Sequence, residues 1–299
     1  EHHVDLLFVA EGYTAARGAE AVGAARRLTA ALFREEPYKS RERDFNVRVL
    51  HVPSAVPGVH RPQAAEARRT PVSAEYNVFD SERYLLTLEN RALRESAASA
   101  PYDALVLLVN EAQYGGGGVF NAHAAVAARN EFADYLFGHE FAHHFAALAD
   151  EYYTSDVAYE TGLTDRPEPW EPNVTALESL GALKWRDLVE ATTPLPTPWN
   201  NEAFDARAAE YQATRRALRA RNAPEAELSA LFRAQQAWEQ AFFATLPYAG
   251  RVGAYEGAGY ETKGLYRPEQ DCLMFSRNPV GFCRVCRRAI DRVIDLHVR

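Results

Sequence analysis

The 299-residue chain has a hydrophobic fraction of 47% and a charged fraction of 25%, a composition typical of a globular protein that buries a full core. Its formal net charge of −8 argues against a nucleic acid or an anionic membrane surface as the partner. No apolar run approaches the roughly 18 residues that a membrane-spanning helix needs. The length suits one large domain or two ordinary ones.

The first third of the chain alternates strand and helix patterns. It opens on EHHVDLLFVAEGY, inside a strand-like run and without an initiator Met or signal peptide, so we expect a fragment of a longer precursor. Apolar runs and alternation predict strands at Val4–Ala10, Phe45–Val52 and Tyr102–Val109. Helices are expected from an N-cap at Thr14 to about Phe33, and over Ser81–Ser99. This order predicts an α/β domain with largely parallel strands.

Two irregular stretches accompany these elements. Pro53–Pro71 is Pro-rich and charged, so we expect a long loop of the kind that often borders a site. Gly115–Gly118 predicts a flexible turn or a backbone that lets another chain approach closely, and it lacks the Lys-Ser/Thr of a phosphate loop. Val119–Ala128 follows as a small-residue strand. It is either a sheet-edge strand to which an extended peptide adds, or one arm of a plain hairpin.

The stretch HEFAHHFAALADEYY, from His139 to Tyr153, carries the chemistry. His139 and His143 stand four apart on a predicted helix over 131–145, so both imidazoles can face one metal ion. Glu140 lies beside them as a general base that need not bind the metal. This HExxH pattern is typical of zinc hydrolases. His144 points about 100° away from His143, which indicates a surface residue or one that supports the ligands.

The second half of the chain changes character. Residues 154–200 are rich in Pro and Trp and predict a lower lobe of loops held by Trp170, Trp185 and Trp199. Asn201–Leu246 is strongly helical with a break at residues 222–224, which predicts a helical hairpin acting as a solvated strut. A terminal helix is expected from about Cys283 to Val298.

All three cysteines lie near the C-terminus. Cys283 and Cys286 form a lone CxxC, which is half of a zinc site at best, since no second CxxC completes it. We therefore expect a disulfide from Cys272 to Cys283 or to Cys286, and with it an oxidising compartment.

Several blocks, in this order, resemble the IgA peptidase family of zinc metalloendopeptidases, which are metzincin-like zincins. They are EGYT near the start, FNV, YDALVLLVN before the Gly run, HEFAHHFAALADEY, EPNVT, EGAGY, KGLYRP, CLM and FCRVC. The resemblance covers nearly the whole chain except the helical hairpin. It implies a single catalytic domain over 1–299, with an upper lobe of 1–153 that holds the zinc helix. A lower lobe of 154–299 would include the helical insert at 201–246.

The resemblance also implies roles for single residues. His139 and His143 would be zinc ligands, Glu140 the catalytic base, and Met274 the methionine of the turn that metzincins place beneath the metal. On a straight helix Asp150 would lie about 10 Å further along the axis than His143, too far to share the metal, so a turn is required before the third ligand. Metzincins turn at a Gly where this chain has Ala146, and we expect the turn here near Ala147–Ala149. We expect Asp150 as the third ligand, with Glu151 as the alternative.

The motif and the resemblance together imply an endopeptidase that uses Zn²⁺, and the resemblance implies that it is secreted and bacterial. Glu140 would take a proton from a zinc-activated water and pass it to the leaving amine, and a Tyr from 255–266 would help bind the oxyanion. Its partner would be a protein or peptide, glycosylated in some cases, and we expect a monomer. The alternatives are a catalytically weak zincin-fold module that binds peptide or glycoprotein, and an enzyme acting on another amide.

Overall fold

The computed structural model describes residues 2–62, 67–155 and 167–299. Residues 63–66 of the expected Pro-rich loop and 156–166 of the expected lower lobe lie outside the described residues. The chain forms two compact units, one of residues 1–147 with 290–299 and one of residues 148–289. Among the described residues, no helix combines the length and apolarity needed to cross a membrane.

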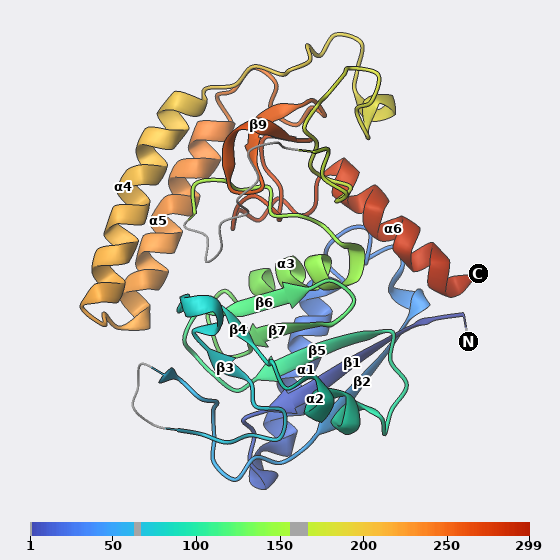
Figure 1. Ribbon diagram of the computed structural model, residues 1–299, viewed down its shortest axis with the longest axis vertical. Coiled ribbons are helices and arrows are strands. Elements are labelled where there is room, and N and C mark those ends of the chain that lie inside the picture. Colours follow the sequence, from blue (N-terminus) through green and yellow to red (C-terminus); the bar gives the residue numbers. More distant parts are fainter. Residues whose placement is uncertain (1, 63–66, 156–166) are drawn as a thin grey trace. The chain divides into compact units, whose positions relative to one another are not determined.

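The first unit is built on a five-stranded mixed sheet in the order β2-β1-β5-β7-β6 (Figure 1). Neighbouring strands β2, β1, β5 and β7 run parallel, and β6 pairs antiparallel with β7. The strands are β1 (Val4–Glu11), β2 (Phe45–His51), β5 (Ala104–Val109), β6 (Gly116–Val119) and β7 (His123–Ala127). The expected mixed α/β fold with largely parallel strands is confirmed.

Alternate residues of the buried strands pack on opposite faces of this sheet, as the pleat requires. On one face, Leu7 and Leu107 join a buried cluster with Leu93 of helix α2 (Asn90–Ala97). On the other face, the Phe8 ring lies 5.3 Å from the Phe137 ring of helix α3. Helices α1 (Gly18–Leu32) and α3 (Ala133–Ala146) are joined by the ion pair of Arg27 with Asp134. The helix that carries HExxH is therefore anchored to the central strands by aromatic packing.

Two local expectations for this unit are wrong, and the structure decides between two alternatives for a third element. The helix expected over Ser81–Ser99 is restricted to α2, because Leu85–Leu86 forms strand β4 and pairs with strand β3 (Glu75–Tyr76). The side chain of Thr14 makes no capping hydrogen bond. The small-residue strand after the glycines is β7, which pairs antiparallel with β6, so the hairpin alternative is confirmed. The sheet-edge alternative is wrong for it, because the glycine run itself forms the edge strand β6.

The second unit contains a pair of long helices and a two-stranded sheet. Helices α4 (Asn201–Ala220) and α5 (Glu225–Phe243) are separated at the expected break, and the rings of Phe204 and Phe243 lie 5.8 Å apart. Strands β8 (Tyr255–Ala258) and β9 (Glu261–Arg267) pair antiparallel. Helix α6 (Arg284–Val298) starts in the second unit, and its residues from 290 onward belong to the first unit.

Buried tryptophan and arginine side chains organise the second unit. Trp185 is fully buried and its indole N–H donates to Gly253 O at 2.6 Å. The Arg267 guanidinium is also fully buried; it lies 4.3 Å from the Trp199 ring centroid and donates to Gly257 O at 2.7 Å. Trp170 is 66% exposed, so the expectation that it holds this lobe together is wrong.

Besides His139 of the motif, His123 and His144 of the first unit are buried. His144 is only 4% exposed, so its expected surface position is wrong. Its Nε2 accepts from the Leu105 N–H at 3.1 Å and its Nδ1 lies 3.1 Å from Val119 O, an arrangement that suits the neutral ring. Burial lowers the pKa of both His144 and His123 from 6.5 to about 4. Both rings stay uncharged in the folded protein at neutral pH.

These depressed pKa values predict a loss of stability in mild acid. Above pH 6.5, His123 is neutral in both the folded and the unfolded states and makes no difference. Between pH 6.5 and 4 the unfolded chain binds the proton more readily, so folding weakens. Between pH 6.5 and 4.5, the free energy of unfolding of His123→Gln should fall by roughly 2 kcal/mol less than that of the wild type. Urea unfolding at several pH values measures this free energy, with exposed His3→Gln as the control. The same dependence of unfolding free energy on pH in the wild type and in His123→Gln would contradict the prediction.

The contact between β6 and α3 predicts a second stability effect. A Cβ added at Gly118 would meet Glu140 O and, at 2.8 Å, the Cβ of His143. Gly118→Ala should therefore lower the free energy of unfolding by about 1–3 kcal/mol through overpacking. Gly23→Ala on α1 is the matched control, because nothing lies within 4 Å of its added Cβ. That control should gain up to about 1 kcal/mol; an unchanged melting temperature for Gly118→Ala would refute the tight contact.

Candidate metal centre

Helix α3 brings the two histidines of the motif together. The Nε2 atoms of His139 and His143 lie 3.1 Å apart. Two imidazoles bound to one tetrahedral zinc ion at 2.0–2.1 Å would have nitrogens about 3.3 Å apart. His139 is only 4% exposed, so its ring is held in a protein environment. The pair is spaced for a shared cation, as the spacing of four residues predicted.

A tyrosine that sequence reasoning missed lies against the first histidine. The Tyr135 hydroxyl is 3.5 Å from Nδ1 of His139, at the limit of hydrogen bonding, and the two ring centroids are 5.5 Å apart. A partner at Nδ1 leaves Nε2 available for a metal and helps to orient the ring. The spacing of four residues between Tyr135 and His139 on the predicted helix could have indicated this contact.

Glu140 lies on the same helix beside the edge strand. A Cβ added at Gly116 of β6 would stand 3.0 Å from the Glu140 Cγ, so the carboxylate side chain runs close along the glycine backbone. The glycines form a strand in place of the flexible turn, and the close approach that they permit is that of a helix of the same chain. Glu140 is not one of the residues whose ligand atoms gather with those of the two histidines.

The helix ends where the sequence required a turn. Helix α3 stops at Ala146, and Ala147 adopts the left-handed conformation with φ 54° and ψ 31°. Its N–H caps the helix by donating to Ala142 O. An alanine in this conformation costs roughly 1 kcal/mol relative to glycine. The turn expected near Ala147–Ala149 is confirmed, and it begins one residue after the position of the metzincin glycine.

Asn173 holds the segment that follows the turn. Its side chain accepts from the Ala149 N–H at 2.8 Å and donates to Ala149 O at 2.9 Å. Its amide also donates to Glu151 Oε1 at 3.0 Å. Asn173 is fully buried, so this residue of the Asn-Val-Thr sequon serves the protein interior. Sequence analysis missed this role, because a sequon carries no signal for it.

Asp150 follows along the chain and joins the histidines. His139, His143 and Asp150 each offer one ligand atom, and these atoms lie within 4.8 Å of one another. Two imidazole nitrogens and a carboxylate oxygen form a donor set that fits catalytic zinc. The Tyr260 hydroxyl donates a short hydrogen bond to Asp150 and lies 3.1 Å from the Tyr152 hydroxyl.

The other tyrosine hydroxyls of the 255–266 block have different surroundings. Tyr255 is buried and its hydroxyl lies 3.0 Å from both Tyr248 O and Arg251 O. Burial raises the pKa of Tyr266, and its neighbour Glu256 adds to this shift. Tyr260 is therefore the tyrosine of the block whose hydroxyl reaches the Asp150 carboxylate.

Glu151 has a different environment from its neighbour Asp150. It is fully buried, and its N–H donates to Met274 O at 2.9 Å. Met274 is itself fully buried in the short segment between strand β9 and helix α6. The Glu151 carboxylate lies among the cysteines and is not grouped with the histidines.

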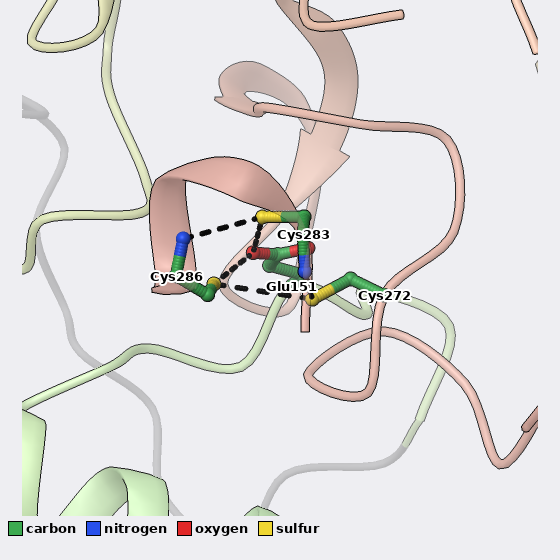
Figure 2. Close-up of side chains that lie close together, drawn as sticks. All are labelled: Glu151, Cys272, Cys283 and Cys286. Carbon is green, nitrogen blue, oxygen red and sulfur yellow. Dashed lines mark hydrogen bonds between the residues drawn. The ribbon is translucent and has the colours of Figure 1, made fainter. Parts of the chain in front are cut away.

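The expected disulfide is not formed. Cys272, Cys283 and Cys286 are all free thiols, and the Sγ atoms of Cys272 and Cys286 lie 3.9 Å apart (Figure 2). A disulfide needs about 2.05 Å between its sulfurs. The disulfide prediction is therefore wrong, and the oxidising compartment inferred from it loses that support.

Comparison with known proteins identifies the family. The sequence matches the family described as IgA Peptidase M64 over residues 1–294, which is nearly the whole chain. No curated protein gives a significant match. The resemblance noted from the sequence blocks is confirmed. Because the match extends from the first strand into the last helix, the chain belongs to the IgA peptidase M64 family.

Proposed function

We propose that this protein is a zinc-dependent endopeptidase. Membership of a peptidase family supports hydrolysis of peptide bonds in a protein substrate. The observation that carries the zinc assignment is the grouping of His139, His143 and Asp150, with the two Nε2 atoms 3.1 Å apart. This donor set leaves a coordination position for water, as catalytic zinc sites do.

The three ligands would hold zinc, which acts as a Lewis acid and lowers the pKa of water to about 7. Glu140 takes the proton of the attacking water at its carboxylate and gives it to the amine of the departing peptide. Its place on the helix, directly after His139, keeps it near the water without making it a ligand. Tyr260 holds the Asp150 carboxylate in position through its hydroxyl.

The edge strand β6 is the proposed place for the substrate backbone. It ends the sheet on the side of β7, and Glu140 lies against it at Gly116. The Gly116 N–H already donates to Arg83 O at 3.1 Å. We therefore assign the segment from Gly117 to Val119 to pairing with an extended peptide.

A binding module with a zincin fold is the alternative from another class. Zinc content and cleavage of an unfolded protein, with and without a chelator, distinguish the two. Cleavage that stops with the chelator and returns with zinc supports the peptidase. Zinc binding without cleavage supports the binding module. An extracytoplasmic location stays a prediction that rests on the family resemblance alone.

The role of Glu140 gives the first test of the mechanism. Glu140→Ala should retain zinc and lose several orders of magnitude in kcat/KM, because it removes the base and no ligand. His139→Ala should lose both the zinc of this site and the activity. Exposed Glu20→Ala on α1 is the control and should behave as the wild type. Near-normal turnover of zinc-loaded Glu140→Ala would disprove the mechanism.

The assignment of Asp150 as the third ligand can be tested by comparing its substitution with that of Tyr260, its hydrogen-bonding partner. Asp150→Ala should abolish zinc binding at the site that His139→Ala also empties. Tyr260→Phe should weaken it by about 10–100-fold, since it removes only the support of a ligand. Competition with a calibrated chelator measures both affinities. Wild-type affinity in Asp150→Ala would assign the third ligand to another residue.

A further inference from the structure

A second group of metal-binding side chains lies within residues 148–289. Glu151, Cys272, Cys283 and Cys286 each offer one ligand atom, and the four atoms lie within 4.8 Å of one another (Figure 2). Glu151, Cys272 and Cys286 are fully buried, and Cys283 is 5% exposed. A lone CxxC is thus completed by a third cysteine and a carboxylate that come from other parts of the chain.

The distances suit a tetrahedral ion. Two thiolates bound to zinc at 2.3 Å have sulfurs about 3.8 Å apart, and a thiolate and a carboxylate oxygen are separated by about 3.5 Å. The Cys272 and Cys286 sulfurs are 3.9 Å apart. Glu151 Oε1 lies 3.8 Å from Cys283 Sγ and 3.1 Å from Cys286 Sγ. Each separation is within about 0.4 Å of the zinc geometry.

Backbone amides point at the sulfurs. Cys272 Sγ accepts from the N–H groups of Met274 at 3.4 Å and Cys283 at 3.2 Å. Cys283 Sγ accepts from the Cys286 N–H at 3.4 Å. The CxxC also lies at the start of helix α6, whose N-terminal end carries a partial positive charge. These donors stabilise thiolates, the form of cysteine that binds metal.

The surroundings of the Glu151 carboxylate give an independent sign of a cation site. Its Oε1 accepts from the Asn173 amide at 3.0 Å. Within the described part of the chain, Oε2 is buried and has no hydrogen-bond partner. A buried carboxylate with only one of its oxygens hydrogen-bonded costs free energy unless a nearby cation neutralises its charge. Fully buried Arg267 also interacts electrostatically with Glu151, which offsets part of the negative charge of four anionic ligands.

We propose that Glu151, Cys272, Cys283 and Cys286 bind a structural zinc ion, distinct from the ion assigned to the histidines. Four protein ligands close the coordination sphere, which marks a structural and not a catalytic site. The proposal goes beyond the peptidase function and does not depend on it.

A zinc ion at this site would fix the position of the backbone next to Asp150. Zinc would tie Glu151 to the Cys272 segment and to the start of α6. Glu151 is the residue after Asp150 and shares Asn173 with Ala149. Metal binding at the cysteines would therefore hold the backbone that presents Asp150, and its free energy would add to the stability of the second unit.

The test uses the full chain without the histidine site. His139→Ala/His143→Ala protein, purified under reducing conditions, should carry one zinc per chain by native mass spectrometry. The wild type should carry two. Replacement of zinc by cobalt(II) in the double variant should give an intense near-ultraviolet band from thiolate-to-metal charge transfer. If the double variant does not fold, the wild type decides alone: two metals with this band support the proposal, and one metal without it refutes the proposal.

Substitution of the ligands gives the matched comparison. Adding Glu151→Gln or Cys283→Ser to the double variant should lower zinc affinity at least 10-fold and shift or remove the cobalt band. Glu239→Gln is the control, because Glu239 is also a buried carboxyl but lies on α5 and accepts from Gln235 at 2.9 Å. Three reactive thiols with no bound metal, or the mass of a protein with an internal disulfide, would overturn the proposal.

Discussion

The candidate catalytic site depends on how closely helix α3 approaches the glycine strand β6. At Gly118 there is no space for a Cβ beside Glu140 O and His143 Cβ. Because β6 is the edge of the sheet, this approach puts Glu140 next to the strand that would bind a peptide. The Phe8 and Phe137 rings anchor the helix on the same face of the sheet. The edge strand, Glu140 and the two histidines are thus held by packing of the first unit.

The chain beyond α3 separates two adjacent carboxylates. Ala147 reverses the backbone, Asn173 holds Ala149 on both sides, and the next two side chains enter different surroundings. Asp150 joins the histidines and Tyr260, whereas Glu151 joins the buried cysteines. If both groups bind zinc, a catalytic and a structural ion would be linked through a single peptide bond.

Prediction from the sequence succeeded where the pattern was local. The apolar runs at β1 and β5 and the helix of the motif were identified because a few neighbouring residues decide them. It failed where distant partners decide. Leu85–Leu86 became a strand because β3 pairs with it, and the glycine run became an edge strand because β7 pairs with it. Trp170 was assigned to the interior by residue type, yet its side chain is 66% exposed.

By itself the sequence determined that His139 and His143 share one face of a helix, because a separation of four residues stacks side chains on consecutive turns. It also determined that the helix must turn before Asp150, because a straight helix would carry that carboxylate out of reach. Only the tertiary structure decided that Glu151 lies with the cysteines and that Cys272 meets Cys286 without a disulfide. The reason is physical: contacts between distant segments depend on how the intervening chain packs, and residue spacing does not encode that packing.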